Sequence, residues 1–273
     1  MGCCAPPGDV YLGMRSTLLF LLLLAACTPG RRGNPPAGDE EDVMAVLYQQ
    51  QAAEYKALCL QSYDLARRNV EDSLKAHRKG GLPLAVITDL DETALDNSPY
   101  QVWAYRHHRT YDPASWKQWC DRAMADTVPG ALSFFNWAAG HHVAIFYVSN
   151  RDTGVLGSTM LNMRRLGFPQ VDSSHFYLKT NTSSKEARRR EIERHFDVVA
   201  LLGDDLIDLD SAFDGASPEK RASEVYRLKD RWGKRYIVFP NAVYGDWEQA
   251  LYGARRLSLE EKDSIRVSKL HGY

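Results

Sequence analysis

Five short apolar runs alternate along the chain with segments in which apolar residues recur at helical spacing, and this alternation restricts the possible fold classes. Strands that are buried on both faces read as continuous apolar runs, and such strands occur in parallel sheets covered by helices. The pattern therefore predicts an α/β fold with a parallel sheet and helices on both of its faces. The expected strands cover 82–90, 142–150, 175–179, 198–205 and 235–241, and the expected helices cover 43–78, as one helix or two, 113–126, 130–139, 153–166, 184–195 and 245–256.

Polar side chains stand where the first four apolar runs end. Ligands of parallel sheets bind outside the carboxyl ends of the strands, so these side chains mark the expected site. They are Asp89 and Asp91, Ser149 and Asn150, Lys179, and Asp204 and Asp205.

The acidic stretch DLDET, residues 89–93, needs a positive partner. Two carboxylates one residue apart at a strand end are costly unless a cation or a proton offsets their charge. Mg²⁺ prefers oxygen ligands and suits such a cluster. A calcium loop that starts at Asp89 would need Gly at its sixth position and Glu at its twelfth, but these are Ala94 and Tyr100. A Walker A loop is absent from the sequence, which argues against P-loop chemistry.

The charge balance bears on the class of partner. The chain has 34 Lys and Arg residues against 35 Asp and Glu residues, so its formal net charge is −1. No overall basic field exists to attract a nucleic-acid polymer, and none is expected as a partner. The pairs His107-His108 and His141-His142 are predicted to be surface or loop residues rather than metal ligands.

The N-terminus has the organisation of a secretory signal. Arg15 precedes an apolar run from Leu18 to Ala26, which is too short to span a bilayer. The string Leu24 to Cys27, LAAC, resembles the lipobox of bacterial lipoproteins, in which the peptide is cut before a Cys that carries the lipids. A plain signal peptide cut near the same place is the alternative. Residues 1–27 are thus expected to be a signal peptide, with 1–13 an upstream mis-start before Met14.

The segment that follows, residues 28–42, is rich in Pro, Gly and polar residues and is predicted to be a flexible tether. A folded domain is expected over 43–273. The residue after the lipobox Cys is Thr28 rather than Asp, and this resembles the pattern of lipoproteins that are sorted to the outer membrane. The expected location is the bacterial cell envelope, with a lipid anchor at Cys27 in the outer membrane facing the periplasm.

Two further cysteines, Cys59 and Cys120, would remain in the mature protein in an oxidising compartment. A disulfide and two buried thiols are both compatible with their spacing.

The ordered motifs carry a more specific resemblance. The motif D-x-D-x-T after an apolar strand is similar to the first motif of the haloacid dehalogenase superfamily of phosphotransferases. Ser149, Lys185 and GDDLIDLD follow in that superfamily's order. The chain resembles above all the class C acid phosphatases, the bacterial lipoprotein type, through DLDETALDNSPY, VPGAL, YVSNR, SSKEARR, GDDLIDL and FPNAVYGDWE. This resemblance implies a Rossmann-like phosphatase domain over 43–273 with a small, mainly helical cap, formed by the N-terminal helices and residues of about 100–128.

The resemblance also implies a role for each motif residue. Asp89 would be the nucleophile that forms an aspartyl-phosphate. Asp91 would protonate the leaving group and then deprotonate water. The remaining roles are phosphate binding by Thr93, Ser149, Asn150 and Lys185; Mg²⁺ binding by the Asp89 carboxylate, the Asp91 carbonyl and Asp204; and support from behind these ligands by Asp205 and Asp208.

Some assignments stay open at this point. Lys179 also ends a strand and competes with Lys185 for the phosphate, although Lys185 matches the family's SSK position. Asp208 could instead satisfy the free N–H groups at a helix start. Arg188 to Arg190 are interpreted as a solvated helix face. Arg151 is a candidate for ordering the loop after Ser149.

The prediction of the substrate class depends on aromatic residues. By resemblance, Tyr244 would stack on the base of a nucleoside monophosphate, and Tyr100, Trp103 or Trp116 would complete the sandwich. The expected function is Mg²⁺-dependent hydrolysis of small phosphomonoesters. The alternatives are a phosphatase dedicated to one metabolite and a ligand-binding surface lipoprotein with a vestigial site. Family members include dimers, so a homodimer is an expected state.

Overall fold

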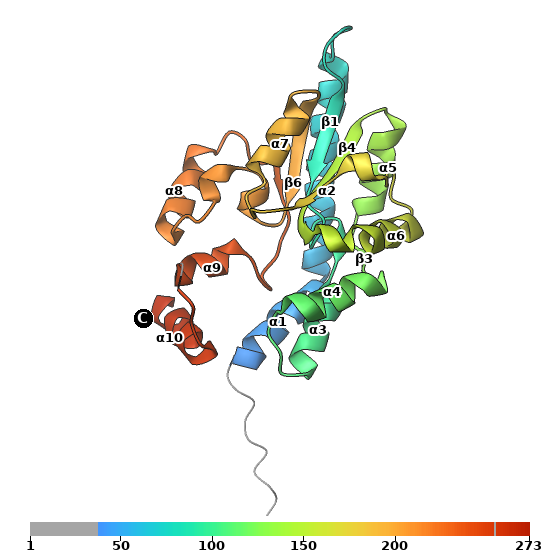
Figure 1. The fold of residues 1–273 in the computed structure, drawn as a ribbon. Helices are drawn as coiled ribbons and strands as arrows, with labels where there is room; N and C mark the ends of the chain where they lie inside the picture. The colour runs from blue at the N-terminus through green and yellow to red at the C-terminus, as the bar shows by residue number, and fades with distance from the viewer. Residues whose placement is uncertain (1–37, 254) are drawn as a thin grey trace, which may run out of the picture. The chain divides into compact units, whose positions relative to one another are not determined.

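The fold is built on a sheet of five parallel strands, seen in a computed structural model that describes residues 38–253 and 255–273 (Figure 1). In sheet order these are β5 (Phe176–Lys179), β4 (Ala144–Asp152), β1 (Leu84–Thr88), β6 (Asp197–Gly203) and β7 (Tyr236–Val238). All five expected strands are present and every pair is parallel, so the predicted α/β class is confirmed. The chain places β4 and then β5 on one side of β1, and β6 and then β7 on the other, so the switch in strand order lies at the carboxyl end of β1.

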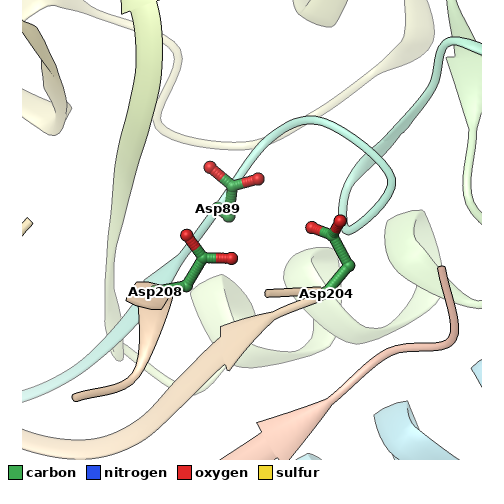
Figure 2. Close-up of side chains that lie close together, drawn as sticks. All are labelled: Asp89, Asp204 and Asp208. Carbon is green, nitrogen blue, oxygen red and sulfur yellow. The ribbon is translucent and has the colours of Figure 1, made fainter. Parts of the chain in front are cut away.

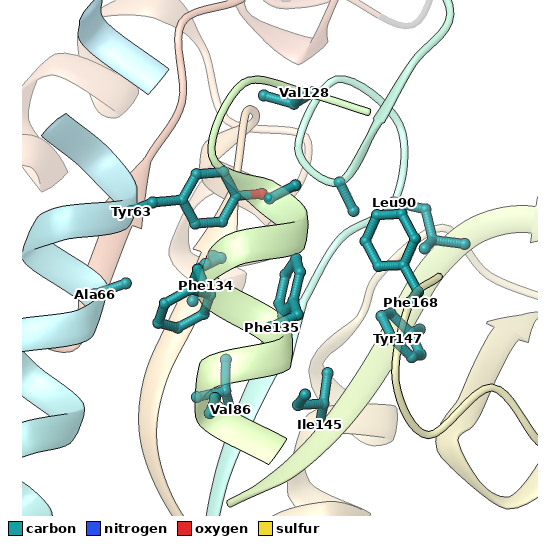
Figure 3. Packing of buried hydrophobic residues seen from close by; sticks show 14 of the residues in the cluster. Tyr63, Ala66, Val86, Leu90, Val128, Phe134, Phe135, Ile145, Tyr147 and Phe168 are labelled. Atoms are coloured by element: carbon teal, nitrogen blue, oxygen red, sulfur yellow. The ribbon is translucent and has the colours of Figure 1, made fainter. Parts of the chain in front are cut away.

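Helices cover both faces of this sheet because each central strand is apolar on both sides. Val86 of β1 belongs to the core shared with α2 (Ala53–Ala76), α5 (Ala131–Gly140) and α6 (Leu156–Leu166). Its neighbours Ala85 and Ile87 belong to the core on the other face, with α7 (Glu186–Glu193) and α8 (Pro218–Arg227) near it. Figure 3 shows Tyr63 of α2 packed beside Phe134 of α5, whose rings lie 5.4 Å apart.

The N-terminal segment forms two helices, α1 (Gly38–Gln51) and α2. They are divided at Ala52, whose φ of −70° and ψ of 130° are extended. Helix α1 begins at Gly38, inside the stretch 28–42 that was expected to be a tether. The predicted signal peptide, Cys27 and residues 28–37 lie outside the described residues.

A small subdomain is inserted between β1 and β4. It contains β2 (Leu95–Asp96) and β3 (Asp126–Thr127), paired antiparallel, with α3 (Ser98–Arg106) and α4 (Pro113–Arg122) between them. Asp112 caps α4 by accepting hydrogen bonds of 3.0 Å from the N–H groups of Ala114 and Ser115. We call residues 95–127 the cap.

The N-terminal helices differ from the expected cap in one respect. Helix α1 reaches the cap, where Gln49 donates to Asp96 and Gln50 to Ser98, both at 2.9 Å. Helix α2 instead lies on the main sheet, because its apolar side is long enough to cover β6, β7 and α5. The cap therefore receives α1 only, and α2 belongs to the main domain.

The C-terminal part holds α9 (Asp246–Tyr252) and α10 (Leu259–Lys269), and the expected helix 245–256 ends earlier than predicted. Helix α10 starts with a capping box of Ser258 and Glu261. Arg266 of α10 pairs with Glu248 of α9 at 2.6 Å. Four short 3₁₀ turns complete the described chain: η1 (Thr153–Val155), η2 (Ser173–His175), η3 (Leu206–Asp208) and η4 (Ser211–Phe213).

Three smaller expectations can be compared with the structure. Cys59 and Cys120 are both free and buried, so they do not form a disulfide with each other. The histidines of the two His-His pairs are exposed, as predicted. Within residues 38–253 and 255–273, no helix combines the length and apolar character needed to cross a membrane.

Candidate active site

A tight turn after β1 places the first acidic residue inside the molecule. The Asp89 N–H extends the sheet by donating to the Leu202 carbonyl at 2.9 Å, and Asp89 is only 7% exposed. The chain then turns through Glu92, whose φ of 58° lies in the left-handed region that is uncommon for a residue with a side chain. The Tyr63 hydroxyl of α2 holds this turn by donating to the Thr93 carbonyl at 2.6 Å.

Three carboxylates from two neighbouring strand ends meet below this turn. Asp89 follows β1, Asp204 follows β6, and Asp208 lies in the η3 turn just beyond. Each offers an oxygen, and these oxygens all lie within 4.8 Å of one another (Figure 2). Of the residues expected to bind Mg²⁺, Asp89 and Asp204 are therefore brought together. Asp208, expected to act from behind the ligands, has its carboxylate within the cluster itself.

Lys185 lies inside the carboxylate cluster. Its ammonium forms ion pairs with Asp89 and with Asp208, the latter at 2.6 Å, and its side chain is only 2% exposed. Residues Ser183 and Ser184 lead into α7 and deliver Lys185 at its N-terminal boundary. The competing residue Lys179 ends β5 and forms no ion pair among the described residues. The geometry thus favours Lys185 as the cation of the site.

Burial and mutual repulsion shift the acid equilibria of the cluster. Burial, with Asp208 and Asp91 nearby, raises the pKa of Asp89 to about 7 even though Lys185 acts in the opposite direction. Burial, with Asp208 and Asp89 nearby, raises the pKa of Asp204 well above its ordinary value, and burial also raises the pKa of Asp208. One ammonium does not offset three clustered carboxylates, of which Asp89 and Asp208 are buried and Asp204 is half-buried, and this leaves the cluster able to bind protons or a cation.

The residues around Asp204 hold it in a fixed orientation. The Thr93 hydroxyl donates to one of its oxygens at 2.9 Å, and the Asn241 amide donates to the other at 2.8 Å. Carboxylate oxygens in this arrangement match the hard, oxygen-only ligand set that Mg²⁺ prefers. Asn241, which lies just after β7, was not recognised from the sequence, although it is a polar residue beyond a strand end like those that were.

Asp205 has a different role from its neighbour. It forms an ion pair with Arg221 of α8 at 3.0 Å and accepts a hydrogen bond from the Asp246 N–H. Asp205 also caps η3, while Asp208 completes that capping box. Both readings of Asp208 therefore apply, since one carboxylate satisfies the start of η3 and pairs with Lys185.

The end of β4 supplies the expected phosphate-binding residues. Ser149 is fully buried, and its hydroxyl accepts a hydrogen bond from the Arg151 N–H at 3.1 Å and lies 3.4 Å from Asp91. Asn150 presents its side-chain oxygen to Arg188 at 2.7 Å.

The interpretation of Arg188 to Arg190 as a solvated face is wrong for its first two members. Arg188 donates to the Ser149 and Ser184 carbonyls at 2.7 Å and 3.1 Å and so joins the two loops that carry Ser149 and Lys185. Arg189 is 3% exposed and donates to the Ile207 and Asp208 carbonyls. Only Arg190 faces solvent. A run of three arginines on a helix has no periodicity that would separate these environments.

Tyr244 lies at the rim of the site, where its hydroxyl contacts the Glu92 carboxylate. Burial raises the pKa of Glu92 well above its ordinary value. Glu92 was not assigned a role from the sequence, because nothing in DLDET distinguishes a buried Glu from an exposed one. Tyr100 is 2% exposed and its hydroxyl lies 3.0 Å from the Ser115 hydroxyl, so it packs inside the cap. Trp103 and Trp116 are half-buried.

Replacing Lys185 by Met should destabilise the protein by about 3–5 kcal/mol at pH 7.5, because two buried carboxylates lose their common cation. The loss should be smaller at pH 5, where the raised pKa of Asp89 allows protonation to remove the repulsion. Denaturant unfolding at both pH values measures the effect. Lys179→Met is the matched control and should change stability little; equal losses in the two variants would contradict the assignment of Lys185.

Position 203, the last residue of β6, has no room for a side chain and therefore requires glycine. A Cβ atom there would overlap the side chain of Asp208. Gly203→Ala should therefore destabilise the protein by about 1–3 kcal/mol and displace Asp208 from Lys185. Gly157→Ala in α6 is the control, because its Cβ would meet open space. Thermal unfolding checks the prediction, and a Gly203→Ala protein as stable as the control would oppose it.

Comparisons with known proteins agree with this geometry. The family model described as HAD superfamily, subfamily IIIB (acid phosphatase) matches residues 34–247. The structure of the class C acid phosphatase from Bacillus anthracis superposes with a TM-score of 0.82 and 36% identity, covering 86% of this chain and 98% of that chain. The same enzyme with tungstate bound gives the same values.

A more distant relative is acid phosphatase 1 from Solanum lycopersicum. It is 27% identical over 133 residues, which cover 45% of this chain and 51% of the tomato protein. The chain thus aligns with about half the length of this curated relative. The resemblance to class C enzymes drawn from the sequence is confirmed by the Bacillus structure and by the family match. The chain belongs to subfamily IIIB of the haloacid dehalogenase (HAD) superfamily, the acid phosphatases, and is a phosphomonoesterase by family.

Proposed function

We propose that this protein is a Mg²⁺-dependent acid phosphatase that hydrolyses small phosphomonoesters through an aspartyl-phosphate on Asp89. The observation that carries the proposal is the cluster of the buried Asp89, Asp208 and Lys185 with the half-buried Asp204 at the carboxyl edge of the sheet. A buried carboxylate beside a lysine and two further acids adds nothing to apolar packing. It can act as a nucleophile toward an anionic phosphoryl group, because the lysine offsets part of the charge repulsion.

In the first step an Asp89 oxygen attacks phosphorus and the bond between phosphorus and the leaving oxygen breaks. The electron pair of that bond stays on the leaving oxygen, which takes a proton from Asp91. Lys185 offsets the charge of the phosphoryl oxygens and of Asp89 during the approach. The Ser149 hydroxyl and the amide of Asn150 are available to bind phosphoryl oxygens.

In the second step water attacks the phosphorus of the aspartyl-phosphate and gives a proton to Asp91. The bond to Asp89 breaks, which releases inorganic phosphate and restores both carboxyl groups. Asp89, Asp204 and the Asp91 carbonyl would hold Mg²⁺, which as a Lewis acid lowers the charge repulsion at phosphorus. Thr93 and Asn241 keep Asp204 in place for that role.

The substrates that we propose are nucleoside monophosphates and related small esters. Tyr244 lies at the rim of the site, and the half-buried Trp103 and Trp116 belong to the cap above it. Aromatic rings stack on any base, so hydrolysis across all nucleobases is expected. The Bacillus relative was crystallised with tungstate, a tetrahedral oxyanion shaped like phosphate. Tungstate should therefore inhibit this enzyme competitively with a phosphate ester.

A panel of nucleotides, sugar phosphates and aryl phosphates, each assayed with and without Mg²⁺, tests the proposed function. Release of phosphate from many esters in the presence of Mg²⁺ is the expected result. Hydrolysis of one ester alone would indicate a dedicated metabolite phosphatase. No release from any ester between pH 4 and pH 8 would leave the ligand-binding lipoprotein as the better description.

We also infer that the mature protein is tethered to the bacterial outer membrane through lipids on Cys27, facing the periplasm. The support is the string LAAC at the end of an apolar run. Cys27→Ser should move the protein from the membrane fraction to the soluble fraction.

A homodimer is the proposed assembly. Light scattering on the detergent-free protein that lacks residues 1–27 should give twice the mass of that shortened chain.

The stabilising effect of Mg²⁺ should grow with pH. The folded pKa of Asp89 is about 7 against an ordinary value of 3.8, so the metal-free fold binds a proton that the unfolded chain releases. This contribution is complete below about pH 3.8 and is lost as the pH rises through 7. Mg²⁺ must displace such protons, so the gain in Tm should be larger at pH 7.5 than at pH 5. Equal gains at both pH values would contradict a metal site at Asp89.

A further inference from the structure

The side chain of Asp91 is held by a set of nitrogen donors that treat its two oxygens differently. Oδ1 accepts hydrogen bonds from Arg151 Nη2 at 2.8 Å, Arg151 Nε at 3.0 Å and Asn97 Nδ2 at 2.8 Å. Oδ2 has only the longer contacts of 3.3 Å to Arg151 Nε and 3.4 Å to the Ser149 hydroxyl. Oδ1 is therefore saturated with donors, and Oδ2 is the oxygen left for a substrate.

Both residues that hold Oδ1 are buried and are themselves oriented. Arg151 is 3% exposed and its Nη1 donates to the Thr159 hydroxyl of α6 at 3.0 Å. Asn97 is fully buried, and its side-chain oxygen accepts from Arg151 Nη2 at 3.2 Å. The orientation of the Asn97 amide is thus fixed, with its oxygen toward Arg151 and its nitrogen toward Asp91.

Helix α4 of the cap contacts both anchors. Trp119 donates its indole N–H to the same Asn97 oxygen at 2.8 Å. The ring of Trp116, one turn earlier on α4, lies 5.6 Å from the Arg151 guanidinium, within the range of a cation–π contact. A single cap helix therefore touches the amide and the guanidinium that fix Asp91, although no residue of α4 contacts Asp91 directly among the described hydrogen bonds.

We propose that Trp119, Asn97 and Arg151 form a relay through which cap helix α4 aims Oδ2 of Asp91 at the leaving group. This inference rests on the proposed function, because it assigns a purpose to the orientation of the proposed acid. The three members of the relay are positioning residues: they set the direction of proton transfer without touching the substrate. The position of α4 thereby controls how well the acid is aligned with the leaving group.

The relay matters only when the leaving oxygen needs a proton. An alkyl phosphate releases a strongly basic alkoxide, so proton transfer from Asp91 to that oxygen accompanies breaking of its bond to phosphorus. A 4-nitrophenyl phosphate releases a stable nitrophenolate, which leaves without a proton. A misaligned acid should therefore slow the first substrate and spare the second, whereas general damage to the site would slow both.

The experiment compares kcat/KM of glycerol 3-phosphate and 4-nitrophenyl phosphate for the full chain and its variants. Trp119→Phe removes the indole N–H and keeps an aromatic ring, and Asn97→Ala removes the amide. Both should lower kcat/KM for glycerol phosphate by about 10-fold or more and change that for nitrophenyl phosphate by less than about 2-fold, since a general acid contributes roughly 10²–10⁴-fold. Trp119→Phe keeps the test decisive if Asn97→Ala does not fold.

Trp232→Phe is the matched control. Trp232 also uses its indole N–H in a hydrogen bond of 2.8 Å, to the Val225 carbonyl, and it packs against the core on the face that carries α7 and α8. It should leave the ratio of the two kcat/KM values unchanged. In an Asp91→Asn background, Trp119→Phe should have no further effect on the ratio, because the group that it orients is already absent.

The relay is overturned if Trp119→Phe slows both substrates equally, or if it still changes the ratio when Asp91 is Asn. A wild-type protein that hydrolyses neither ester would overturn the proposed function, and the relay with it. A wild type active on both esters with variants that keep its selectivity would reject the relay alone.

Discussion

Asp89→Asn is expected to reduce kcat for phosphate release by about 10⁴-fold or more, since removal of a catalytic nucleophile leaves only binding and electrostatic effects. The amide has almost the same shape as the carboxylate but cannot attack phosphorus. Asp72→Asn, at a side chain that is 77% exposed, is the matched control and should retain full activity. Initial rates of phosphate release under saturating substrate measure both variants.

The loss of activity should occur without loss of the fold. The ionised form of Asp89 is disfavoured by burial, so a neutral amide removes a source of repulsion toward Asp208 and Asp91. In metal-free buffer above pH 7 the Tm of Asp89→Asn should equal or exceed that of the wild type. An Asp89→Asn protein with more than a tenth of wild-type kcat would show that another group attacks phosphorus.

Removal of divalent metal should lower activity by about 10³-fold, and added Mg²⁺ should restore it, because a bound cation contributes several kcal/mol to a charged transition state. Without a cation, the phosphoryl oxygens would approach three clustered carboxylates whose charge the ammonium of Lys185 offsets only in part. The measurement is phosphate release after dialysis against EDTA, followed by titration with Mg²⁺.

Asp204→Asn supplies the structural control for metal removal. The variant keeps an oxygen for the Thr93 hydroxyl, but it loses a negative charge from the cluster. Its activity should need a higher Mg²⁺ concentration for half-saturation than that of the wild type. Full activity of the wild type after dialysis against EDTA, with no response to Mg²⁺, would rule out the proposed dependence on metal.

The elements that could be predicted are those whose signal is local. Continuous apolar runs identified all five strands, and the polar residues after them identified Asp89, Ser149 and Asp204 at one edge of the sheet. Strand direction alone brings such residues to the same side, so no knowledge of side-chain packing was needed. The position of Lys185 beside Asp89 was expected only through the family resemblance, because nothing local separates it from Lys179.

The features that could not be predicted depend on contacts between distant segments. The contacts of the half-buried Arg188 and the buried Arg189 are made with carbonyl groups of β4 and η3 that approach α7 in the folded chain. The pairing of Asp91 with Arg151 spans 60 residues, and its link to Trp119 passes through Asn97. Helix α2 was expected to belong to the cap and instead covers a face of the sheet, since an apolar stripe does not specify its partner.

Mass spectrometry of the enzyme quenched in acid during turnover tests most directly whether Asp89 is the nucleophile. The reaction is stopped within milliseconds of mixing with substrate and Mg²⁺, and the peptides that contain Asp89 are analysed for an added phosphoryl group. The expected result is a phosphorylated Asp89 in the wild type and none in Asp89→Asn. A phosphoryl group on any other residue, or none in the wild type even under conditions where phosphate is released in a burst, would contradict an aspartyl-phosphate on Asp89.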